Sequence, residues 1–149
     1  ATMMYGHVET VEERMEHLVR IRTLQGERPA GSKGFLAFIA WPFQGKGTRL
    51  AKRFGWVPTS AAEHVRMVAM ARIMLTNVPH IQASWLTVGV DVALLTLLAG
   101  ADDMGSIMIE ENVVASAGVR NRLDAAGMQN AIRSVGLVPR LRDQGYRMR

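Results

Sequence analysis

Four short apolar segments, each followed by a helical pattern, constrain the fold of this chain more than any other feature. They are "ATMMYG" at the amino end, "FLAFIAW" from Phe35, "HIQASW" from His80 and "MGSIMI" from Met104. Such alternation is typical of a parallel sheet with right-handed crossovers. Four units are too few to close a barrel, which takes eight. The sequence therefore predicts an α/β fold of four sequential parallel β/α units, as a small open sheet or as half of a (β/α)8 barrel.

Local signals place the helices between these strands. Thr10 with Glu13, and Ser60 with Glu63, have the spacing of a capping box, so helices are predicted to follow both. A last helix is predicted over 124–135, before a basic tail over 137–149. The predicted buried stripe of the first helix consists of Val11, Met15, Leu18, Val19, Arg22 and Leu24.

The composition bounds the class of protein. A chain of 149 residues supports one domain, here 1–149, and no apolar run reaches the length of a membrane span, so we expect a soluble cytoplasmic protein. The net charge of +5 comes largely from the tail and from a cluster over 46–53. These clusters lack interleaved aromatic residues, so we expect them to be solvated and expect no nucleic-acid partner.

Ring, amide and carboxylate groups gather where the four predicted strands end. The carboxyl ends of parallel strands meet at one edge of a sheet, which is where ligands bind in such folds. We therefore expect one binding mouth built from Tyr5, His7, Glu9, Trp41, Gln44, Ser84, Thr87, Glu110, Glu111 and Asn112.

Side-chain alternation orients the last of these groups. Ser106, Met108 and Glu110 share one face of the predicted fourth strand, and the opposite face is aliphatic apart from Glu111. The aliphatic face should pack on helices, so Glu110 is predicted to point inward. Glu111 would hold a loop or a helix N-terminus. The same alternation points Gln82 and Ser84 inward from the third strand.

Three catalytic motifs are incomplete. "GHVET" contains the H-x-E of zinc deaminases, but the chain has no cysteine for the rest of that signature. "WPFQGKGT" has Ala40 and Gly47 where a phosphate-binding loop needs Gly and Ser or Thr. The four histidines show no H-E-x-x-H spacing. We predict no metal site within this chain.

The motifs "MMYGHVET", "FIAWPFQ", "IQASW" and "MGSIMIEENVV", in this order, resemble the C-terminal half of the radical S-adenosylmethionine enzymes of the futalosine route to menaquinone. "WPFQ" and "GSIMIEENVV" look most like the cyclic dehypoxanthinyl futalosine synthases within that family. The resemblance implies that the chain supplies units five to eight of a (β/α)8 barrel. The "GKGTRL" turn and the segment "AKRFGWVPT" depart from the family pattern.

The resemblance also implies a reaction. A 5′-deoxyadenosyl radical would abstract hydrogen from the ribose of dehypoxanthine futalosine, and the carbon radical would close a spirocycle on the aromatic ring. S-adenosylmethionine and a [4Fe-4S] cluster serve this family, but a chain without cysteine cannot hold the cluster, so this chain alone is expected to be inactive. Glu110 and His7 would be catalytic. The substrate-binding set would be Tyr5, Glu9, Trp41, Gln44, Gln82, Ser84, Glu111 and Asn112.

Other functions stay open at this point. The chain could come from the related aminofutalosine synthases or from the coenzyme F420 side-ring synthases. It could also be a non-catalytic half-barrel that pairs with a missing N-terminal half or with a second copy through its unpaired edge strands. A small parallel-sheet enzyme that uses the acids without radical chemistry is a third class.

Overall fold

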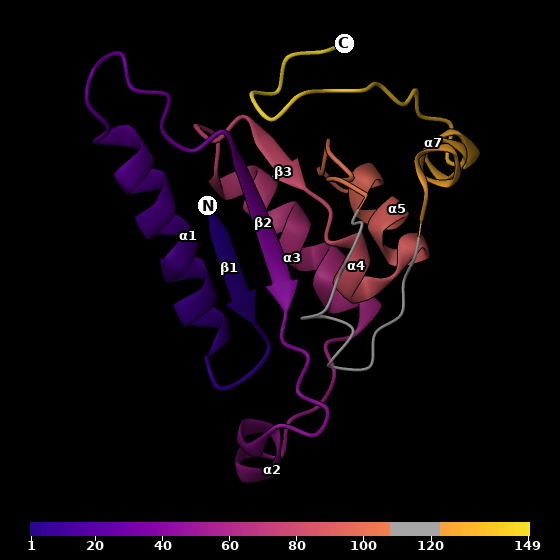
Figure 1. Ribbon diagram of the computed structural model, residues 1–149. Coiled ribbons are helices and arrows are strands. Elements are labelled where there is room, and N and C mark those ends of the chain that lie inside the picture. Colours follow the sequence, from indigo (N-terminus) through magenta and orange to yellow (C-terminus); the bar gives the residue numbers. More distant parts are fainter. Residues whose placement is uncertain (108–122) are drawn as a thin grey trace.

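The structure is a computed structural model that describes residues 1–107 and 123–149. Its sheet consists of β1 (Thr2–Tyr5), β2 (Ala37–Pro42) and β3 (His80–Gln82), in that spatial order and all parallel. The strand predicted from Phe35 is therefore central, as the half-barrel hypothesis requires. Sequential parallel strands joined by helices confirm the α/β class (Figure 1).

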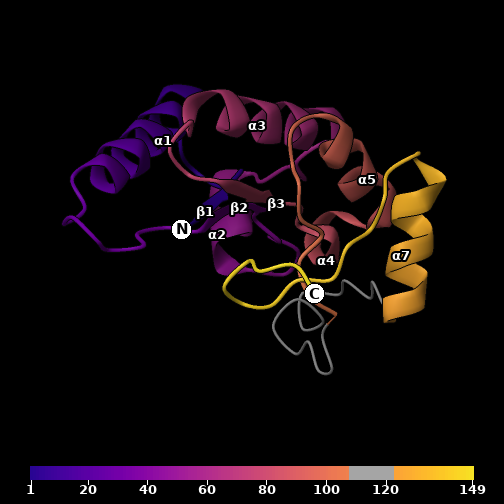
Figure 2. The same cartoon turned by 90° about the horizontal axis from the view of Figure 1, so that it is seen from above.

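Helices α1 (Val11–Gly26) and α3 (Ala61–Met74) cover one face of the sheet (Figure 2). The strands bury the side chains that point to these helices, among them Tyr5, Phe38 and Ile81, each with no exposed surface. On the opposite face Met4 is 52% exposed and Trp41 is 43% exposed. The core of the described residues therefore lies between the sheet and α1 and α3.

Helix α1 begins as predicted but buries a different face. Thr10 and Glu13 form the complete capping box, each side chain bonded to the other's backbone N–H. Val11 and Leu24 of the predicted stripe are exposed, however, and the buried residues are Leu18, Ile21 and Gln25. Gln25 is buried because its amide bonds the backbone of Phe35 and Asn77, which fixes the start of β2.

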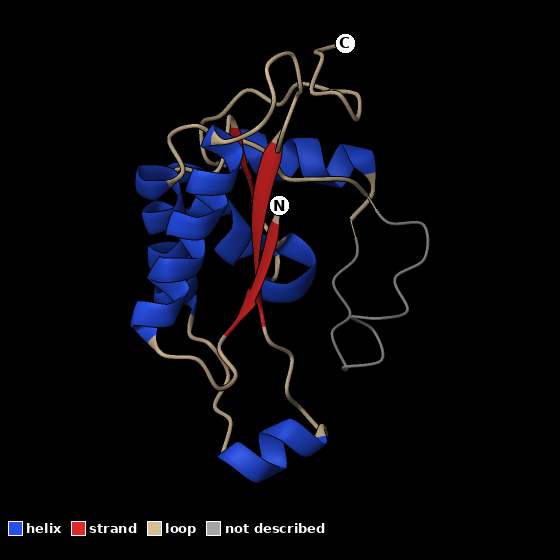
Figure 3. Ribbon diagram, turned by 90° about the vertical axis from the view of Figure 1, so that its left-hand side faces the viewer, coloured by secondary structure: helices blue, strands red, loops and turns tan. Residues whose placement is uncertain are grey.

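The remaining described helices are α2 (Arg49–Phe54), α4 (Trp85–Val88), α5 (Val90–Leu98) and α7 (Ala125–Ser134). Helix α2 lies in a segment for which no helix was predicted. Thr48 caps its first turn, and Gly55 ends it in the left-handed region at φ 64°. It lies beyond the carboxyl ends of the strands, away from the sheet (Figure 3). No helix in the described part of the chain is long and apolar enough to cross a bilayer.

Four complete β/α units are not seen in the described residues. Asp103 makes a single parallel bridge to Gln82, but Met104 to Ile107 do not continue it as a strand. The reason is local: Gly105 adopts φ 81°, and its N–H donates to the Asp103 side chain instead of to a neighbouring strand. The rest of the predicted fourth strand, Met108 and Ile109, lies outside the described residues.

The basic tail over 137–149 is not simply solvated. Arg142 donates to Asp103 at 2.5 Å, and the Tyr146 hydroxyl donates to the same carboxylate at 2.7 Å. The Tyr146 ring stacks on His80 with the ring centroids 4.0 Å apart. These contacts hold the tail near the amino ends of the strands, opposite the ends where polar groups were predicted to gather (Figure 1).

Candidate functional site

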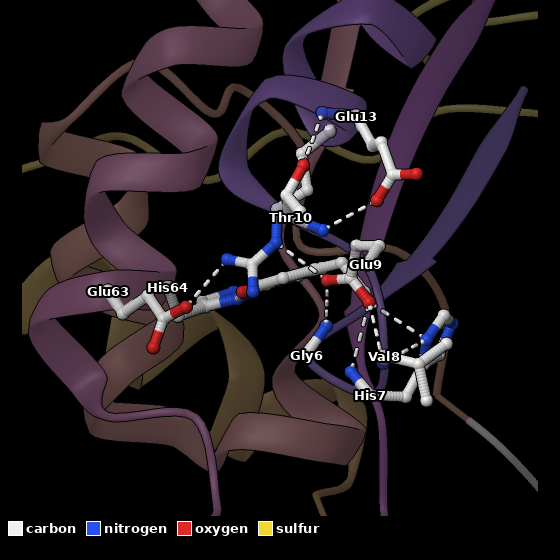
Figure 4. Close-up of polar contacts among 10 residues, drawn as sticks. Gly6, His7, Val8, Glu9, Thr10, Glu13, Glu63 and His64 are labelled. Atoms are coloured by element: carbon white, nitrogen blue, oxygen red, sulfur yellow. Dashed lines mark hydrogen bonds and ion pairs between the residues drawn. The ribbon is translucent and has the colours of Figure 1, made fainter.

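The turn that follows β1 is organised around the carboxylate of Glu9. It accepts backbone N–H groups from Gly6 at 2.5 Å, His7 at 3.1 Å and Val8 at 3.2 Å (Figure 4). The chain can fold back in this way because Gly6 takes φ 82°, a conformation that favours glycine. The turn is thus built before any ligand binds.

An ion-pair chain anchors this turn to the helices. Arg14 Nε donates to Glu9 at 2.6 Å, and Arg14 Nη1 donates to Glu63 at 2.6 Å, so the guanidinium joins β1, α1 and α3. Burial alone would raise the pKa of Glu9, but the backbone N–H groups and Arg14 outweigh it and lower the pKa to about 2. Glu9 is therefore ionised at neutral pH and serves to position the turn.

His7 presents the reactive edge of the turn. Its Nδ1 accepts the Val8 N–H at 2.7 Å, so the neutral ring carries its proton on Nε2. The same Nδ1 lies 2.8 Å from Glu9, a contact that becomes an ion pair only when the ring is protonated. His7 is a donor through Nε2 when neutral and can gain a proton next to a carboxylate, as a proton-transfer group must.

Tyr5 points away from the open face of the sheet, into the core. Its hydroxyl lies 2.7 Å from His64 Nδ1, and the Arg14 guanidinium lies 4.9 Å from its ring centroid. Burial raises the pKa of Tyr5, with the Glu63 charge adding to the effect, and burial lowers the pKa of His64 to about 4. Tyr5 therefore supports the site from behind, through a neutral His64.

Aromatic contacts join this turn to the loop after β2. His7 meets Phe43 edge to face at 5.7 Å between centroids, and Phe43 meets Trp56 in the same way at 6.0 Å. A cavity of about 200 Å³ lies behind this loop, and Gln44, Trp56, Thr59 and His64 contribute to its lining. The carboxyl ends of β1 and β2 thus form one continuous region.

Other predicted residues lie apart from this region. Gln82 pairs with Ile39, three residues of β2 before Pro42, which pairs with Tyr5. This stagger corresponds to roughly 10 Å along the strand. Ser84 is buried at the start of α4, where its Oγ lies 2.5 Å from Thr87 Oγ1. Trp41 lies on the open face of β2. Glu110, Glu111 and Asn112 lie outside the described residues.

The residues present do not fit an iron–sulfur cluster. The sequence has no cysteine. Within residues 1–107 and 123–149, no group of three or more His, Asp or Glu side chains could hold a metal ion.

The sequence analysis did not identify Arg14, Trp56 or Glu63 as site residues. Arg14 has one signal, since it falls one helical turn before Leu18 on the buried face of α1, an unusual place for a cation without a partner. Glu63 was assigned to a capping box. It does receive the Ser60 cap through its N–H, but its carboxylate pairs with Arg14.

The fold and the site together define an α/β protein of sequential parallel units, with its polar residues at the carboxyl ends of the strands. A family model described as the CofH/MqnC C-terminal region matches residues 32–149. The chain belongs to this family.

Relatives of known activity align over nearly the whole chain. It is 44% identical to the cyclic dehypoxanthine futalosine synthase of Streptomyces coelicolor, over 98% of this chain and 35% of that protein. It is 38% identical to the aminodeoxyfutalosine synthase of Thermus thermophilus, over 99% of this chain and 39% of that protein. The 5-amino-6-(D-ribitylamino)uracil–L-tyrosine 4-hydroxyphenyl transferase of Methanoculleus marisnigri is 40% identical, over 98% and 40% respectively. The chain thus spans well under half the length of these relatives.

Proposed function

We propose that this chain forms the substrate-binding, C-terminal part of a radical S-adenosylmethionine enzyme that cyclises dehypoxanthine futalosine. The observation that carries the proposal is the identity of 44% to a cyclic dehypoxanthine futalosine synthase, which extends over 98% of the chain. The pre-built Gly6–Glu9 turn at the carboxyl end of β1 supports it, because ligands of such folds bind at that edge.

In this proposal the chain binds and orients the substrate, and the cluster and the radical step belong to the rest of the complete enzyme. His7 contacts the substrate through Nε2, and Glu9 holds the turn that presents it. Gln44 lines the mouth, and Trp41, Gln82 and Ser84 contribute from β2 and β3. Glu110 is the proposed proton-transfer group, with Glu111 and Asn112 in the same segment of sequence.

The proposed partner is the N-terminal part of the same enzyme. The relatives are much longer than this chain, and one face of its sheet carries the exposed side chains of Met4 and Trp41. In a closed barrel this face would be covered by side chains from the remaining strands. The complete enzyme would then bury both residues.

The direct test is product formation by the complete protein, loaded with its cluster and S-adenosylmethionine and supplied with dehypoxanthine futalosine. Appearance of the cyclised product supports the proposal. Formation only of the products made by the aminodeoxyfutalosine or 4-hydroxyphenyl transferase relatives would assign the chain to those activities instead. Absence of any turnover would favour a non-catalytic module.

A matched pair of variants tests the site assignment. Glu110→Gln keeps the shape and removes the charge, so turnover should fall by about 100-fold, a typical general acid–base contribution. Glu111→Gln should change the thermal midpoint more than turnover. Near-normal turnover of Glu110→Gln would assign that carboxylate a structural role.

A further inference from the structure

The cavity behind the loop after β2 combines apolar walls with buried polar atoms. It lies between the carboxyl end of β2, the amino end of α3 and helix α4. Its apolar walls include Pro42, Phe43, Val88 and Val92. With a volume of about 200 Å³, it has room for more than a single water molecule.

Two side-chain nitrogens in the lining are buried without a hydrogen-bond partner among the described residues. They are Trp56 Nε1 and His64 Nε2. His64 as a whole is only 1% exposed. A buried polar atom without a partner costs free energy, so a pair of them in one cavity indicates that something else completes the site.

Both nitrogens are hydrogen-bond donors. The indole Nε1 of Trp56 can only donate. The Tyr5 hydroxyl has His64 Nδ1 as its hydrogen-bond partner at 2.7 Å, so it donates there and leaves the imidazole proton on Nε2. Burial lowers the pKa of His64 to about 4, so this neutral tautomer persists at neutral pH.

The amino end of α3 adds to the preference for an acceptor. Ser60 caps this 14-residue helix, and Ser60 and Ala61 both line the cavity. The first backbone N–H groups of a helix have no partner within the helix and carry partial positive charge, which favours a negatively charged oxygen nearby. His64, one turn further on, points its unpartnered nitrogen into the same space.

We propose that this cavity binds the carboxylate of a small ligand with an apolar body. The carboxylate oxygens accept from Trp56 Nε1 and His64 Nε2, and the apolar part lies against Phe43 and the valines. This site is distinct from the Glu9 turn, whose donors are already used by Glu9 itself. The inference does not depend on the proposed radical reaction.

The test is calorimetric titration of the complete protein with benzoate and, separately, with benzamide, which has the same shape without the charge. Benzoate should bind at least about 5-fold more tightly. Equal or tighter binding of benzamide, or no binding of either probe, would overturn the proposal. Turnover of dehypoxanthine futalosine is measured on the same preparation, so loss of this inference and loss of the proposed function are separate results.

Variants locate the probe. Trp56→Phe keeps an aromatic wall and removes one donor, so benzoate should bind about 5-fold to 10-fold more weakly, in line with one hydrogen bond. Trp41→Phe makes the same exchange on the open face of the sheet and should leave the affinity unchanged. Should Trp56→Phe fail to fold, a crystal structure with benzoate decides. Protein or water atoms on both donors, with no benzoate present, would contradict the proposal.

Discussion

The turn after β1 and the cavity behind the loop after β2 lie at the same end of the sheet and differ in how their polar atoms are satisfied. In the turn, backbone N–H groups and Arg14 converge on the Glu9 carboxylate. In the cavity, Trp56 Nε1 and His64 Nε2 have no partner within the described part of the chain. The difference separates a scaffold, which is complete by itself, from a site that a ligand can complete.

The largest effect should come from removing the charge at the centre of the turn. Glu9→Gln leaves Arg14 with Glu63 alone and weakens the bonds from the backbone of the turn, so the free energy of unfolding should fall by about 3 kcal/mol. Urea denaturation of the complete protein measures it. Glu12→Gln, at an exposed position in the same helical turn, should change it by less than about 0.5 kcal/mol. Equal effects would mean that Glu9 is not the centre of the turn.

The backbone conformation of the turn should matter nearly as much. A Cβ at Gly6 would lie 2.5 Å from Thr59 Oγ1, and Gly6 has φ 82°. Gly6→Ala should therefore cost about 2 kcal/mol, part from the dihedral angle and part from the contact. Gly47 has φ 79°, and the described residues leave nothing within 4 Å of a Cβ there, so Gly47→Ala should cost about 1 kcal/mol. A Gly6 effect no larger than the Gly47 effect would show that Thr59 yields.

The two regions should lose stability in different pH ranges. His64 has a pKa lowered from 6.5 to about 4, so unfolded chains take up its proton first, and stability falls by about 2 kcal/mol as pH drops from 6.5 to 4. Glu9 has a pKa lowered from 4.5 to about 2, so its stabilisation is present above pH 4.5 and is lost toward pH 2.

Urea midpoints across this pH range separate the two groups. His64→Gln should flatten the loss between pH 6.5 and 4, whereas His17→Gln, on the exposed side of α1, should retain it. A His64→Gln profile that matches the wild type would show that the imidazole is charged in the folded protein.

The smallest effect should come from Tyr5→Phe, which removes one hydroxyl behind the cavity. It leaves His64 Nδ1 without its donor, so the free energy of unfolding should fall by about 1 kcal/mol. The imidazole can then carry its proton on Nδ1, and benzoate should bind more weakly because Nε2 no longer donates. Unchanged benzoate affinity would mean that Tyr5 does not set the tautomer.

The features that the sequence predicted correctly depend on neighbours in the chain. The Thr10–Glu13 box fixes the start of α1, because both partners lie within one helical turn. The apolar run from Phe35 to Trp41 predicts a central strand, because a strand covered by two neighbours needs no polar alternation. The order of strands and helices follows from the same local patterns.

The candidate site was only partly predictable. His7, Glu9 and Gln44 could be named because they follow strands, and parallel strands end at one edge. Their partners could not, because Arg14 pairs with Glu63 across 49 positions of sequence and Tyr5 meets His64 across 59. The fourth predicted strand failed at Gly105, where the side chain of Asp103 captures the backbone N–H.

By itself, the sequence determined the α/β order, the helix starts and the edge at which polar groups gather, since each is a property of a few consecutive residues. Only the tertiary structure decided that α1 buries Leu18, Ile21 and Gln25, that the tail packs on Asp103, and that Trp56 and His64 share a cavity. The physical reason is that strand register and helix packing set these long-range distances, and no local pattern encodes them.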